Sequence, residues 1–158
     1  MNLYTKLLAR QEAGNPVRVG LIGSGKFGSM FLSQVRHIPG MQLMGIADLS
    51  ADRAVAALEN TGWDVDAARA TDFEDARTSG RTMITEDSEA LIAADGLEVV
   101  IDATGNPAAG IRHALLAAKH GRHMIMVNVE ADVLAGAQLV KSFNSAGLVY
   151  SMAYGDQP

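Results

Sequence analysis

The sequence of 158 residues contains no cysteine. This absence excludes a disulfide framework and any metal site built on thiolates. Basic residues are in the minority, since 13 Lys and Arg stand against 18 Asp and Glu and no basic run occurs, which argues against a nucleic-acid partner. No apolar run reaches the roughly 18 residues that a membrane span needs, and the first residues lack the order of a secretory signal. We therefore expect a cytoplasmic protein that binds neither nucleic acid nor a membrane.

Apolar runs alternate with helical patterns over most of the sequence, which is typical of a parallel sheet with crossover helices. Residues 1–15 predict a short N-terminal amphipathic helix, and residues 16–158 predict one further domain. Within it we expect buried strands at 17–22, 41–47, 82–85, 97–101, 123–127 and 148–152. Six such strands predict an α/β fold with a doubly wound parallel sheet, the Rossmann fold, in the strand order 3-2-1-4-5-6.

Two stretches depart from this regular pattern. Residues 63–80 are rich in charged side chains, and we expect them to form a solvated insertion with one helical turn. The sequence also stops directly after the sixth predicted strand. We therefore expect a fragment of a larger protein, whose downstream catalytic domain is absent.

The sharpest motif directly follows the first predicted strand and opens a helix. It is a GxGxxG formed by Gly23, Ser24, Gly25, Lys26, Phe27 and Gly28. The first glycine permits a tight turn, the second lets the backbone approach a pyrophosphate, and the third lets the helix pack closely on the strand. The N–H groups at the start of the helix would face the phosphates. These residues are predicted to bind a dinucleotide, with ordinary turn glycines as the alternative.

An acid follows this motif at the expected distance. Asp48 ends the second predicted strand, about 20 residues on, where its carboxylate would accept hydrogen bonds from the adenosine ribose and favour NAD. A turn or helix-capping aspartate is the alternative. Arg53, one helical turn further, could instead pair with the 2′-phosphate of NADP. These residues leave the choice between NAD and NADP open.

The loop after the fourth predicted strand lies at the same edge of the sheet, beside the point where the strand order reverses. It has the sequence DATGNP from Asp102. Its turn-forming residues explain the loop by themselves. The functional prediction is that the loop backbone lines the nicotinamide ribose, through Ala103, Thr104, Gly105 and Asn106.

The segment NVEAD, from Asn128, closes the fifth predicted strand. We assign Asn128 to the cofactor and expect Asp132 to cap the following helix. Glu130 and Asp156, on the rim beyond the fifth and sixth strands, are the candidate catalytic residues, which would contact a substrate hydroxyl or a metal ion; solvated loop acids are the alternative. The four histidines are scattered over helices and helix ends, so we assign them no catalytic role, and no metal site is predicted in this chain.

Together, these motifs resemble the N-terminal nucleotide-binding domain of homoserine dehydrogenase-like oxidoreductases. Within them, the chain is most similar to a bacterial branch with a later SAF-type domain, which includes an enzyme similar in activity to 1-deoxy-D-xylulose 5-phosphate reductoisomerase (DXR-like). The similarity is carried by GLIGSGKFGSMF from Gly20, VNVEADVLAGAQLV from Val127 and VYSMAYGDQP from Val149. It covers this chain but only the first part of such a protein.

The resemblance implies an NADPH-dependent oxidoreductase of the isoprenoid pathway that converts 1-deoxy-D-xylulose 5-phosphate, a sugar phosphate, to 2-C-methyl-D-erythritol 4-phosphate, with a divalent cation in the full-length enzyme. We expect that enzyme to be a homo-oligomer and this fragment alone to be inactive. The sequence departs from the pattern at one point: related enzymes carry Asn-Lys after the fifth strand, whereas Asn128 is followed by Val129 and Glu130. This difference argues against ordinary homoserine oxidation. Reductoisomerases also place metal-binding acids after the sixth strand, where only Asp156 stands.

Three alternatives stay open at this point. They are a homoserine dehydrogenase-like oxidoreductase of another substrate, a non-enzymatic NAD(P)-sensing module, and an S-adenosylmethionine-dependent methyltransferase, which also uses a Gly-rich loop and an acid. A sensor would need an effector surface, and the sequence shows no basic patch or DNA-reading helix. Gly28 favours a pyrophosphate-binding turn over the methyltransferase.

Overall fold

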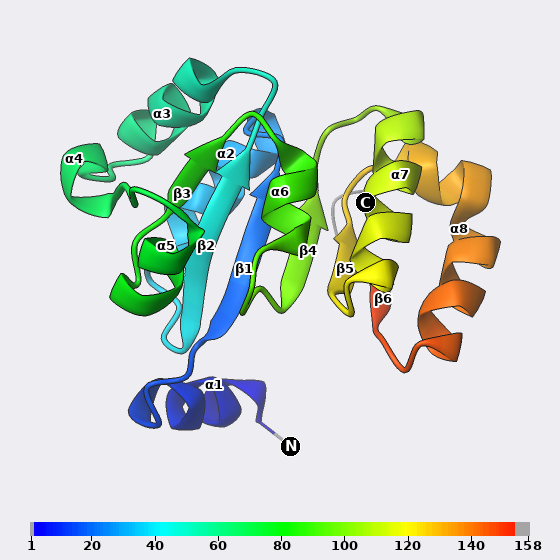
Figure 1. Cartoon of the computed structure of the whole chain (residues 1–158), viewed down its shortest axis with the longest axis horizontal. Coiled ribbons are helices and arrows are strands. Elements are labelled where there is room, and N and C mark those ends of the chain that lie inside the picture. The colour runs from blue at the N-terminus through cyan, green and yellow to red at the C-terminus, as the bar shows by residue number, and fades with distance from the viewer. Residues whose placement is uncertain (1, 154–158) are drawn as a thin grey trace.

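The computed structural model describes residues 2–153 (Figure 1). Within them, six strands form one sheet in the order β3-β2-β1-β4-β5-β6, and every neighbouring pair is parallel. This confirms the predicted Rossmann topology. The strands are β1 (Val17–Ile22), β2 (Met41–Ala47), β3 (Met83–Thr85), β4 (Val99–Asp102), β5 (His123–Met126) and β6 (Tyr150–Met152).

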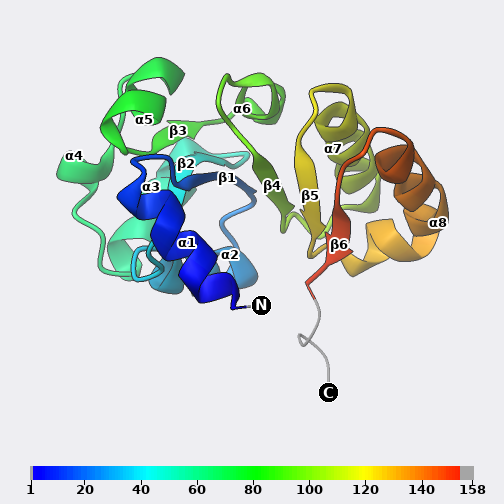
Figure 2. The same cartoon turned by 90° about the horizontal axis from the view of Figure 1, so that it is seen from below.

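Helices cover both faces of this sheet (Figure 2). Because side chains alternate between the faces of a strand, each face has its own apolar cluster. Val19 and Leu21 of β1 belong to the cluster under α2 and α3, whereas Ile22 belongs to the cluster under α5, α6, α7 and α8. The helices are α1 (Leu3–Glu12), α2 (Lys26–Val35), α3 (Ala51–Asn60), α4 (Val65–Ala68), α5 (Phe73–Ser79), α6 (Ser88–Ala93), α7 (Pro107–Lys119) and α8 (Val129–Ser145).

Helix α1 lies at the amino ends of the strands, away from the edge where the predicted site residues gather (Figure 1). An ion pair of 2.6 Å between Arg10 and Glu98 joins it to the segment before β4. Within residues 2–153, the helices are too short or too polar to span a bilayer.

The prediction of a solvated insertion at residues 63–80 is wrong, because this stretch forms α4 and α5 and packs on the domain. Ala76 is fully buried, and its carbonyl accepts a hydrogen bond of 2.7 Å from the side chain of Gln42 on β2. The acidic residues that suggested a solvated loop are at the helix starts, where Asp64 and Asp72 accept hydrogen bonds from backbone N–H groups. A few buried apolar side chains therefore decide the structure of a mostly charged segment.

Candidate functional site

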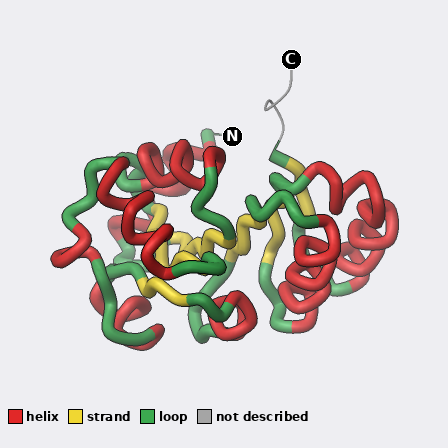
Figure 3. The backbone as a smooth tube through the Cα atoms, turned by 90° about the horizontal axis from the view of Figure 1, so that it is seen from above, coloured by secondary structure: helices red, strands yellow, loops and turns green. Residues whose placement is uncertain are grey.

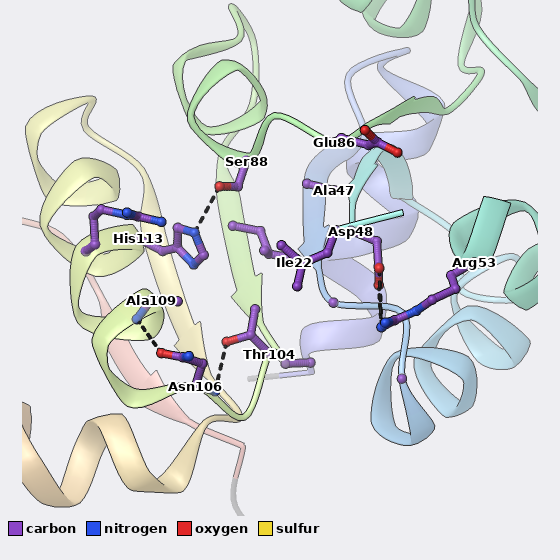
Figure 4. A pocket seen from close by; sticks show the side chains of 15 residues that line it. Ile22, Ala47, Asp48, Arg53, Glu86, Ser88, Thr104, Asn106, Ala109 and His113 are labelled. Atoms are coloured by element: carbon purple, nitrogen blue, oxygen red, sulfur yellow. Dashed lines mark hydrogen bonds and ion pairs between the residues drawn. The ribbon is translucent and has the colours of Figure 1, made fainter. Parts of the chain in front are cut away.

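The carboxyl ends of β1, β2 and β4 border a pocket of about 340 Å³ (Figure 4). Figure 3 views the domain from this side of the sheet. In open α/β sheets, ligands bind where the strand order reverses, which here is between β1 and β4. The pocket is lined by several of the predicted cofactor residues, namely Gly23, Gly25, Asp48, Arg53, Ala103, Thr104 and Asn106. It is also lined by Glu86, Ser88, Arg112 and His113, which sequence reasoning did not assign to the site.

The three glycines of the GxGxxG motif have three different surroundings. Gly23 has a φ of +94°, and a Cβ there would lie 2.8 Å from the carbonyl oxygen of Ala103. A Cβ on Gly28 would meet the carbonyl oxygen of Gly23. At Gly25, by contrast, no described residue other than its chain neighbours lies within 4 Å of a built Cβ. Gly23 and Gly28 are thus required by packing, whereas Gly25 leaves space open at the start of α2.

This open space is suited to an anion. Gly25 is the N-cap of α2, so the first N–H groups of a ten-residue helix point toward it. Helix N-termini attract phosphate through these donors and through the helix dipole. Lys26 is exposed at the first position of α2, while Phe27 packs against the cluster under α2 and α3. Of the two, Phe27 has a packing role, so its assignment to the cofactor gains no support from the geometry.

Asp48 is held in place by the glycine loop. Its carboxylate accepts hydrogen bonds from Ser24 N (2.8 Å), Ser24 Oγ (2.6 Å) and Ser50 N (3.2 Å), and Arg53 Nη2 lies 3.3 Å away. Burial alone would raise the pKa of Asp48, but these hydrogen bonds and the Arg53 charge outweigh burial and lower it below its ordinary value. The Asp48 side chain is 2% exposed and that of Arg53 is 63% exposed. The site therefore contains a fixed, buried carboxylate paired with an exposed arginine.

The loop after β4 is organised around the buried carboxylate of Asp102. His113 Nδ1 lies 2.6 Å from Asp102 Oδ2, and Thr104 donates to Oδ1 through its backbone N–H and its hydroxyl, at 3.1 and 2.8 Å. Burial by itself would raise the pKa of Asp102, but the hydrogen bonds from His113 and Thr104 outweigh burial and lower it. A buried acid at the end of a strand needs hydrogen-bond partners. The sequence could therefore have predicted a partner for Asp102, and His113 is that partner.

Asn128 is hydrogen-bonded to the loop after β4. Its side chain donates to the carbonyl of Asn106 at 2.7 Å and accepts from Ala131 N at 3.2 Å. It is thus the N-cap of α8. The expectation that Asp132 caps this helix is wrong, because α8 begins at Val129, three residues before Asp132. Asp132 instead accepts a hydrogen bond of 2.8 Å from the hydroxyl of Tyr150.

Of the two candidate catalytic acids, Glu130 does not line this pocket. Glu130 is exposed in the first turn of α8 and borders a separate shallow hollow, together with Pro107 and Val133. Asp156 lies outside the described residues. Within residues 2–153, no cluster of three or more His, Asp and Glu side chains could hold a metal ion.

The fold and this pocket define the class of protein. Residues 17–154 match the model of the oxidoreductase family with an NAD-binding Rossmann fold, the GFO/IDH/MocA family. The chain belongs to this family, which confirms the prediction of an NAD(P)-dependent oxidoreductase domain. No curated protein matches the sequence.

Solved structures share the fold at low sequence identity. An NAD-binding oxidoreductase from Klebsiella pneumoniae is 16% identical with a TM-score of 0.66, and the match covers 88% of this chain and 34% of that one. Biliverdin reductase from Synechocystis sp. PCC 6803, in complex with biliverdin and NADP+, is 19% identical with a TM-score of 0.67 (87% and 38% covered). Myo-inositol dehydrogenase from Lactobacillus casei, in complex with NAD(H) and myo-inositol, is 15% identical with a TM-score of 0.65 (87% and 36% covered). The chain thus spans little more than a third of these structures.

Proposed function

We propose that this chain holds NADPH or NADH for an oxidoreductase that acts on a small polar substrate. The observation that carries the proposal is the open space at Gly25, at the start of α2 and beside Asp48 and Arg53. In the proposed pose, the pyrophosphate lies at Gly25 and the adenosine ribose lies at Asp48. The nicotinamide half then extends across the loop after β4 toward Asn128. When bound, the nicotinamide supplies the hydride.

The contacts of Asp48 favour NADPH with weak discrimination against NADH. The carboxylate already accepts hydrogen bonds from Ser24 and Ser50, so few of its roughly four acceptor sites are left for ribose hydroxyls. Arg53 has an exposed guanidinium, which can turn from Asp48 toward a 2′-phosphate and pair with it. The family resemblance to NADPH-dependent enzymes supports the same preference.

Replacement of Asp48 by alanine tests this assignment. The variant should gain affinity for NADPH relative to NADH by several-fold, because a negative charge next to the 2′-phosphate is removed and Arg53 is released. Fluorescence titration with both nucleotides measures the ratio. Asp52→Ala is the matched control. Asp52 is an exposed acid in the first turn of α3, the helix that also contains Arg53. A shift of the ratio toward NADH would show that Asp48 does not face the ribose.

For the substrate, we propose the reductoisomerase reaction of the DXR-like branch, in which 1-deoxy-D-xylulose 5-phosphate becomes 2-C-methyl-D-erythritol 4-phosphate in isoprenoid biosynthesis. The similarity of the glycine loop and of the NVEAD segment to that branch supports this choice. A homoserine dehydrogenase-like enzyme of another substrate is the alternative. Glu130 is exposed on the rim after β5, where it could reach a substrate hydroxyl, and Asp156 is proposed for the same side of the site.

An activity assay separates these possibilities. The longer protein that contains this domain should oxidise NADPH with 1-deoxy-D-xylulose 5-phosphate, and Glu130→Gln should lower kcat while leaving the Kd of NADPH unchanged. The 158-residue chain should bind NADPH without turnover, because positioning of the substrate by a second domain accounts for about 7 to 11 kcal/mol of such barriers. Turnover with homoserine, or by the short chain alone, would contradict the proposal.

A further inference from the structure

Three side chains form a hydrogen-bonded chain from the centre of the domain to the wall of the pocket. Asp102 Oδ2 lies 2.6 Å from His113 Nδ1. His113 Nε2 in turn lies 2.9 Å from Ser88 Oγ (Figure 4). Asp102 and His113 are buried, whereas Ser88 is half-buried, and His113 and Ser88 both line the pocket. The proposed cofactor contacts at Gly25, Asp48 and Arg53 do not use this chain.

The ionised carboxylate at its inner end fixes the direction of its own hydrogen bond with His113. Ionised Asp102 can only accept, so His113 Nδ1 must carry a proton. In the neutral imidazole, Nε2 then has no proton and accepts the hydroxyl proton of Ser88. Ser88 has only one proton to donate and uses it on His113. With His113 in this neutral form, Ser88 presents oxygen lone pairs, and no donor, to the pocket.

Ser88 lines the pocket, and the proposed cofactor pose brings the base of the nucleotide toward it. Figure 4 shows Ser88 and His113 on one side of the pocket and Asp48 with Arg53 on the other. If Asp48 marks the ribose and Gly25 the pyrophosphate, the pocket has one remaining direction for the base, toward α6 and α7. Besides its polar residues, the lining contains small and apolar side chains that suit a flat ring, namely Ile22, Ala47, Ala103 and Ala109.

We propose that Ser88, oriented by His113 and Asp102, accepts a hydrogen bond from the exocyclic amino group of adenine and makes the site selective for adenine over 6-oxopurines. The inference rests on the proposed cofactor function and assigns the base-reading residue within that site. Hypoxanthine presents a carbonyl oxygen where adenine has the amino group. Two acceptors would then face each other, and both would lose their hydrogen bonds to water.

The test compares NADPH with its analogue that carries hypoxanthine in place of adenine, by equilibrium titration. The chain should bind NADPH about tenfold more tightly than the analogue, a ratio that corresponds to one hydrogen bond lost and left unsatisfied. Ser88→Ala should bring the ratio of the two dissociation constants close to one. Ser88→Thr keeps the hydroxyl and should restore the preference. A structural role of Ser88 alone would not move this ratio.

The matched control is Ser142→Ala, which removes a hydroxyl that bonds to Gln138 O on the exposed face of α8, and it should keep the full preference. Equal binding of both nucleotides by the unmodified chain, or a preference that survives in Ser88→Ala, would overturn the inference and leave the proposed function in place. Failure to bind either nucleotide would overturn both. Ester hydrolysis that depends on Ser88 would also overturn it, because the three groups would then act as a nucleophilic triad.

Discussion

Replacement of Gly25 by valine should abolish NAD(P)H binding while the domain keeps its cooperative unfolding. No described residue other than its chain neighbours lies within 4 Å of a Cβ at this position, and its φ of −71° suits any residue. The added methyl groups would occupy the space that we assign to the pyrophosphate. The expected cost to stability is about 1 kcal/mol, because valine is a poor N-cap. Fluorescence titration measures binding, and urea denaturation measures stability.

A control for this variant is Ala137→Val, which adds a β-branched side chain on the exposed part of α8, far from the pocket along the sheet. It should bind both nucleotides with unchanged affinity. If Gly25→Val also keeps its affinity, the phosphates do not lie at the start of α2, and the proposed pose is wrong.

In contrast to Gly25→Val, Gly28→Ala should act mainly on stability: the domain should unfold more easily, whether or not nucleotide is present. The new Cβ would be forced against the carbonyl oxygen of Gly23 and would lie 3.5 Å from the side chain of Leu21. The backbone of Gly23 cannot easily shift away from this new Cβ, because Gly23 itself packs against the backbone of Ala103. Such overpacking costs about 1 to 3 kcal/mol. At about 2 to 4 °C for each kcal/mol in a domain of this size, the melting temperature should fall by several degrees.

The matched control is Gly25→Ala, the same substitution three residues earlier in the same motif. It adds a methyl group to open space and loses only the preference for glycine at the N-cap, about 1 kcal/mol, so its melting temperature should fall less than that of Gly28→Ala. Equal melting temperatures for the Gly25 and Gly28 variants would show that the helix does not pack on β1 as closely as the structure indicates.

The fold could be predicted from the sequence because its signals are local. Strands covered on both faces are continuous apolar runs, such as residues 17–22 and 41–47, and the glycines at 14, 40, 62 and 147 follow helices or turns at positive φ. The exception was residues 63–80, where charge dominates the composition. There, tertiary packing of Ala76 on β2 decided the structure, and no local pattern indicated it.

The site was predictable only in part, because some of its contacts are set by local spacing and others only by tertiary structure. Gly25 and Asp48 could be assigned because the fingerprint has a fixed spacing along the chain. His113 was missed because its partners, Asp102 and Ser88, come from other elements and meet only in the folded sheet. Glu130 was predicted on the rim beyond the fifth strand; it lies in the first turn of α8, where it borders a different hollow.

The most direct test of the central claim is a calorimetric titration of this chain with NADPH, NADH and S-adenosylmethionine. The claim is that the start of α2 and the pocket at Asp48 together bind a nicotinamide dinucleotide. It predicts saturable one-to-one binding of NADPH and NADH, no binding of S-adenosylmethionine, and loss of the dinucleotide signal in Gly25→Val. Binding of S-adenosylmethionine in place of the dinucleotides, or the absence of dinucleotide binding by a folded chain, would contradict it.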